Sequence, residues 1–66
     1  MDRDQIAVAA QEIAHEIMTA CADLAPEMAL DASDAVMTRA LCVLKPRDRD
    51  RVGVAVDKIL AAHVGI

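Results

Sequence analysis

The chain is 66 residues long, has a formal net charge of −4, and contains 56% hydrophobic residues without one aromatic residue. A chain of this size forms one domain at most and buries only ~60% of the surface that its unfolded form exposes. So small a core leaves little room for a substrate pocket, and the sequence contains no nucleophile elbow, phosphate-binding loop or metalloprotease helix. We therefore expect residues 1–66 to form one helical domain that is not an enzyme and binds no cofactor or metal.

One long amphipathic helix is expected over about residues 4–25, a stretch that has no glycine or proline. Its apolar side chains recur at spacings of three and four residues, as in a helix that packs along its length against other helices. They are Ile6, Ala10, Ile13, Ile17, Ala20 and Leu24. Further apolar residues widen this stripe to about half of the circumference, more than the ~100° arc usual for a surface helix. The width predicts two neighbours.

A homodimer is predicted from the wide stripe and the small core. Small domains without disulfides or metal often reach stability by oligomerisation, and the high hydrophobic content suggests that apolar surface meets a second chain. We expect the interface on the stripe of the first helix, at Ile6, Ile13, Ile17 and Leu24.

A connector over residues 26–30 and a second helix over about residues 32–44 are expected next. Pro26 disfavours helical geometry in the residue before it, so the first helix should end there, although Pro26 could also open a short extra turn. Asp31 is well placed as the N-cap of the second helix. Pro46 then prevents this helix from continuing.

The third helix is expected over about residues 47–64, with Gly65 as its stop. An alternative for residues 51–56 is a short strand, because three valines alternate there and Gly53 weakens a helix by about 1 kcal/mol. A lone strand would have no partner in the rest of the chain, which favours the helix. The predicted fold is an all-α bundle of three helices, the first of them the longest, completed by dimerisation.

The two halves of the chain differ in charge. Residues 1–38 hold eight acids and one base, whereas residues 39–66 hold six bases and three acids. No basic residue occurs from Asp4 to Thr38, so the polar side of the first helix is acidic. Its acids are Asp4, Glu12, Glu16 and Asp23. Glu12 and Glu16 are four residues apart and repel each other, which is easier to explain if a basic surface compensates them.

The leading functional hypothesis is therefore a non-enzymatic protein–protein interaction module. Such a small adaptor, regulator or inhibitor would dock on a larger macromolecule, a protein partner with a basic surface, through its acidic helix face. Asp-Arg-Asp at residues 2–4 lacks the basic start of a signal peptide, and polar residues interrupt the longest apolar segment, so we expect a cytoplasmic protein without a membrane partner.

Two other functions are considered. Residues 45–51 hold four bases, and a nucleic-acid-binding helix-turn-helix could use them, but two aspartates interrupt the run and no aromatic side chain is available for stacking on bases. Nucleic acid is thus not the expected partner. The Glu-x-x-His spacing of Glu12 and His15 resembles part of a di-iron site in a helical bundle, but both residues fall on the polar side of the helix. Glu12 and His15 are therefore expected to be exposed surface residues rather than metal ligands.

The remaining side chains that could carry chemistry are interpreted structurally. Cys21 and Cys42 are expected to be reduced, buried and apolar in character, because both fall inside predicted helices. His63, near the end of the third helix, is expected at the boundary of the core or at the last carbonyls of that helix. Ser33 is interpreted as a residue near a helix start and not as a nucleophile.

Overall fold

The first helix, α1 (Arg3–Cys21), begins with a capping box. In this computed structural model, which describes residues 1–64, the backbone N–H of Gln5 donates to Asp2 Oδ1 at 2.8 Å, and the backbone N–H of Asp2 donates to Gln5 Oε1 at 2.9 Å. These two bonds satisfy backbone donors that the first turn of a helix leaves free. The cap fixes the start of α1 one residue before the predicted start.

The prediction for the junction between the first two helices was wrong. The helix α1 ends at Cys21, and residues 22–25 form a turn in which the N–H of Leu24 donates to the Cys21 carbonyl at 3.2 Å. Ala25 is extended, as a residue before proline should be, and Pro26 occupies the first position of α2 (Pro26–Leu41). Residues 26–30 are therefore helical, and Asp31 lies inside α2 rather than at its N-cap.

The third helix, α3 (Pro46–Val64), also begins at a proline. The helix α2 ends at Leu41, three residues before the predicted end, and residues 42–45 form the turn. Residues 51–56 are helical, so the strand alternative was wrong. Residues 1–64 contain three helices and no strand, which confirms the all-α prediction. The prediction that the first helix is the longest was wrong, because α1 and α3 each have 19 residues. The predicted stop at Gly65 lies outside the described residues.

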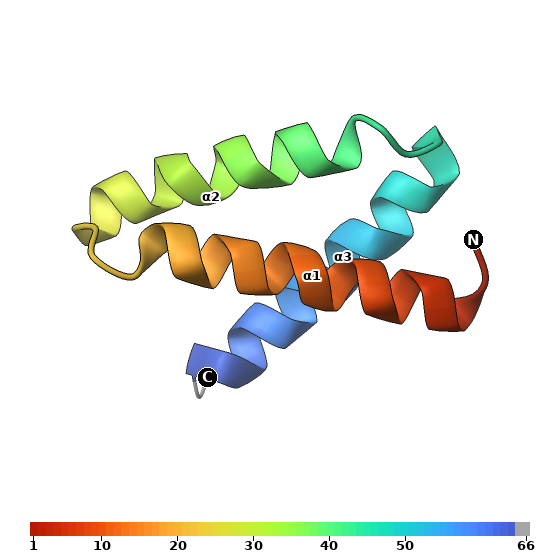
Figure 1. Cartoon of the computed structure of the whole chain (residues 1–66), viewed down its shortest axis with the longest axis horizontal. Coiled ribbons are helices and arrows are strands. Elements are labelled where there is room, and N and C mark those ends of the chain that lie inside the picture. Colours follow the sequence, from red (N-terminus) through yellow and green to blue (C-terminus); the bar gives the residue numbers. More distant parts are fainter. Residues whose placement is uncertain (65–66) are drawn as a thin grey trace.

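The helix α1 is the central element of the bundle. Figure 1 shows α2 running back beside α1, and α3 crossing behind α1 at a steep angle. Both α2 and α3 pack mainly on α1 and contact each other little. The Cα atoms extend over 35 × 24 × 15 Å. The smallest extent is about three times the ~4.6 Å Cα diameter of one helix, as expected for two layers of helices with α3 behind α1.

The core lies where the three helices meet. Its buried apolar residues come from all three: Ile6, Ala10, Ile13, Ala14 and Ile17 of α1, Val36 of α2, and Val52 and Val56 of α3. The two α3 valines and the two α1 alanines have no exposed surface. Small side chains allow crossing helices to approach closely, and the fully buried small residues of this core come from α1 and α3.

Candidate docking face

The four acids expected to form the docking face are all exposed. Asp4, Glu12 and Glu16 project from α1, whereas Asp23 lies in the turn after it because α1 ends at Cys21. The acidic surface is thus carried by the helix over Asp4 to Glu16 and continues onto the turn. Exposed carboxylates keep their hydration, so their placement costs little and leaves them accessible.

Glu16 differs from the other acids because it has a basic partner in the same chain. Arg39 Nη2 of α2 lies 2.7 Å from Glu16 Oε1, with both side chains more than half exposed. This pair joins α1 to α2 across the surface and compensates the repulsion between Glu12 and Glu16. An exposed pair of this kind contributes only ~0.2–1 kcal/mol to stability. The sequence alone did not indicate this pairing, since the two residues are far apart along the chain.

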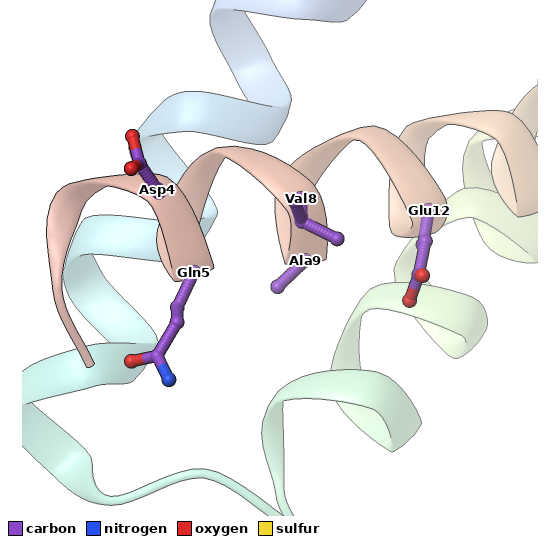
Figure 2. A pocket seen from close by; sticks show the side chains of 5 residues that line it. All are labelled: Asp4, Gln5, Val8, Ala9 and Glu12. Carbon is purple, nitrogen blue, oxygen red and sulfur yellow. The ribbon is translucent and has the colours of Figure 1, made fainter.

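A shallow depression of about 330 Å³ lies within the acidic surface. Its lining comes entirely from α1: Asp4, Gln5, Val8, Ala9 and Glu12. Figure 2 shows Gln5 and Glu12 on either side of Ala9, with Val8 beside them. Val8 is 55% exposed, although it is apolar. The acidic face therefore combines charged side chains with a small apolar surface, which an all-polar solvated face would lack.

Most of the residues predicted for a dimer interface lie in the core of the single chain. Ile6, Ile13 and Ile17 belong to the core of the single chain and are almost wholly covered by its own helices. They have little surface left to offer a second chain. Leu24, in the turn after α1, is exposed. Two neighbours do cover the wide apolar stripe of α1, as predicted, but both belong to the same chain. Dimerisation itself stays a prediction.

Part of the basic segment at residues 45–51 forms hydrogen bonds with backbone groups of its own chain. Arg49 Nε donates to the carbonyls of Leu41 at 3.0 Å and Leu44 at 2.9 Å, and its Nη2 donates to the Cys42 carbonyl at 3.1 Å. These carbonyls belong to the end of α2 and the turn after it, where helical partners are missing. The guanidinium therefore caps α2 from the first turn of α3, a role that the charge pattern did not reveal.

Two more residues of this segment face the start of the chain. Arg51 Nη1 donates to the Met1 carbonyl at 3.4 Å. Asp48 is buried in the first turn of α3, where the helix dipole favours an acid, and its Oδ1 lies 3.6 Å from the amino group of Met1. With these contacts the segment offers less free positive charge than its composition suggests, which weakens the case for a nucleic-acid interface.

Replacing Arg49 by alanine is expected to lower the free energy of unfolding by about 1–2 kcal/mol. The variant loses three hydrogen bonds from a charged donor and leaves the Cys42 and Leu44 carbonyls to water, while the Leu41 carbonyl keeps the backbone N–H of Leu44 at 3.0 Å. Urea unfolding followed by circular dichroism measures the change. Arg47→Ala, which removes the same charge from an exposed neighbour, is the control and should stay within about 0.5 kcal/mol of the parent. Equal stability of the two variants would contradict the capping role.

The cysteines and histidines are not brought together. Cys21 is half-buried and its Sγ donates to the Ala29 carbonyl at 3.4 Å, while Cys42 is exposed with its Sγ 3.2 Å from the Arg39 carbonyl. Both thiols are free, but the prediction that both are buried was wrong for Cys42, which lies just past the end of α2. His15 and His63 are exposed. Within residues 1–64, no three His, Cys, Asp or Glu side chains are grouped to hold a metal ion.

These observations define a small all-α domain whose most distinctive surface is the acidic face of α1. No helix in the described part of the chain has the length and apolarity needed to cross a membrane. Comparison of the chain with models of known protein families, with curated proteins and with solved structures finds no match.

Proposed function

We propose that the protein is a non-enzymatic, cytoplasmic interaction module that docks on a protein partner with a basic surface. The observation that carries the proposal is the depression on α1, where Asp4 and Glu12 stand beside the exposed Val8. Basic side chains of the partner would pair with the carboxylates, and an apolar side chain would cover Val8. Complementary charge of this kind increases the association rate and gives specificity, while the apolar contact adds affinity.

The alternative of nucleic-acid binding has less support. Arg49 and Arg51 both bond to backbone carbonyls of their own chain, and the acids of α1 would repel a phosphate backbone. An acidic face is suited instead to a partner that itself carries positive charge, including a nucleic-acid-binding protein. A regulator or inhibitor that occupies the basic groove of such a protein would fit this surface.

Neutralising Glu12, Glu16 and Asp23 together is expected to weaken partner binding at least ~10-fold at low salt while the fold remains intact. The three side chains are exposed, and the only described ion pair among them contributes little to stability. The variant is Glu12→Gln, Glu16→Gln and Asp23→Asn. A partner captured from the native host by the parent protein would be purified, and its affinity for both proteins measured at several salt concentrations.

The matched control carries Asp31→Asn, Asp50→Asn and Asp57→Asn, which remove three exposed acids from α2 and α3. It has the same net charge as the test variant, so it separates the acidic face from the general charge of the protein. The proposal expects the control to bind as the parent does, with affinity falling as salt rises. If the test variant binds as tightly as the parent at low salt, the acidic face is only solvated surface.

A further inference from the structure

The helix α3 carries an exposed apolar residue, Val54, in its middle. Val54 lies two residues from the buried Val52 and two from the buried Val56, so at ~100° per residue its side chain points away from the core. Figure 1 shows α3 crossing behind α1, which leaves the far side of α3 without a covering helix in the described chain. Val54 is 55% exposed. A single exposed valine is ordinary at a protein surface, so the charges around it decide whether this face has a partner.

Four charged side chains surround Val54 in a regular pattern. Around the helix axis, Asp50 and Asp57 lie ~40–60° to one side of Val54, and Arg51 and Lys58 lie ~40–60° to the other. We call the first pair the acidic row and the second pair the basic row. All four side chains are exposed, and none of them forms an ion pair with another described residue. Two unpaired rows of opposite sign therefore run along α3 with the valine between them.

A depression of about 390 Å³ beside Val54 extends this face to the start of α1. Its lining residues come from both helices: Arg3, Ile6, Asp50, Arg51 and Val54. The depression joins one member of each row to the valine and to a second apolar side chain, that of Ile6. The face is thus one continuous surface with apolar side chains between charged ones, and we call it the outer face of α3.

The two rows are complementary to each other, so a second copy of the outer face matches its charges. A two-fold axis parallel to α3 turns the acidic row of one copy toward the basic row of the other at the same height. Asp50 then faces Arg51 of the second copy, and Asp57 faces Lys58 of the second copy, on both sides of a contact between the two Val54 side chains. Charges that flank an apolar seam set the orientation of paired helices in coiled coils in the same way. Antiparallel pairing would instead bring the two acidic rows together.

We infer that the protein self-associates as a two-fold symmetric dimer in which the outer faces of α3 pack in parallel. This interface differs from the one expected on α1, whose isoleucines are buried in their own chain. Exposed ion pairs and one small apolar contact contribute little, so the dissociation constant should be on the order of hundreds of micromolar. Docking on a basic partner uses other residues, Asp4 and Glu12, and is measured at low micromolar concentration, where the chain is a monomer. The two proposals can therefore fail independently.

Exchanging the two rows within one chain tests the pairing at constant net charge. The exchanged chain carries four substitutions: Asp50→Lys, Arg51→Glu, Asp57→Lys and Lys58→Glu. Its rows are still complementary to each other, so it should self-associate with the affinity of the parent. Mixing it with the parent brings like charges together, so the two chains should bind each other at least ~10-fold more weakly than either binds itself. Antiparallel pairing predicts the reverse, with association of the mixture and repulsion within each chain alone.

Titration of the ¹⁵N-labelled parent with unlabelled parent or exchanged chain, up to about 1 mM, measures both affinities through the amide chemical shifts. The shifts should centre on residues 50–58, and circular dichroism checks that each chain keeps its helices. The control carries Asp34→Lys and Lys45→Glu, an exchange of exposed charges away from the outer face. It should bind the parent as the parent binds itself. Parent shifts that do not change with concentration overturn the inference, as do shifts that avoid residues 50–58 or an exchanged chain that binds the parent as tightly as itself.

Discussion

Ile17→Asp is expected to unfold the chain. Ile17 is 4% exposed in the core of the single chain, so the variant places a carboxylate where water cannot reach it, at a cost of several kcal/mol. It also loses the ~1.5–3 kcal/mol of burying the isoleucine side chain. A folded chain of this length is stable by only about 3–10 kcal/mol, so the two losses together are comparable with the whole. Far-UV circular dichroism at room temperature should show most of the helix lost.

Gln11→Asp is the matched control, because Gln11 is an exposed residue in the middle of the same helix. It introduces the same carboxylate and should keep the helical signal. Since Ile17 is buried within one chain, the unfolding of Ile17→Asp reports the stability of the monomer core and says nothing about a dimer. A well-folded Ile17→Asp protein would contradict the burial of Ile17 between α1 and its neighbouring helices.

Ala14→Leu is expected to lower the free energy of unfolding by about 1–3 kcal/mol. Ala14 has no exposed surface and belongs to the same core as Val52 and Val56 of α3, so a larger side chain must push the helices apart or adopt a strained rotamer. For a chain of this size the loss corresponds to a fall of roughly 5–20 °C in the melting temperature. Thermal unfolding followed by circular dichroism measures it.

Ala7→Leu provides the comparison, since Ala7 lies on an exposed side of α1. The same change of side chain there adds volume into solvent, and leucine is nearly as good a helix former as alanine, so the melting temperature should move by only a few degrees. A melting temperature for Ala14→Leu as high as that of Ala7→Leu would show that α1 and α3 are not packed closely at this point.

The fold was largely predictable because hydrophobic periodicity reports which side of a helix is covered. The spacing of Ile6, Ile13 and Ile17 identified the buried side of α1, and all three are in the core. The same pattern does not say which element does the covering. In this chain α2 and α3 cover the stripe. The isoleucines that were predicted to contact a second copy therefore contact helices of their own chain.

Helix boundaries were harder to predict because a proline can either end one helix or begin the next. Pro26 was interpreted mainly as the start of a connector, but it opens α2. The capping box of Asp2 and Gln5, in contrast, has a recognisable spacing of three residues, but the sequence analysis did not predict it. Side-chain roles that depend on tertiary contact, such as Arg39 beside Glu16 and Arg49 on the end of α2, have no local signal. Exposure of the acidic face could be predicted, but its apolar depression could not.

The position of α1 between two helices that hardly touch has a consequence for folding cooperativity. Because α2 and α3 contact each other little, each is held mainly by its own contacts with α1. A local opening that releases α1 therefore removes the packing of both, while an opening of α2 or α3 alone leaves the other pair in place. The helix α1 is thus the element whose loss is equivalent to global unfolding, and its amide hydrogens are those that only complete unfolding can expose.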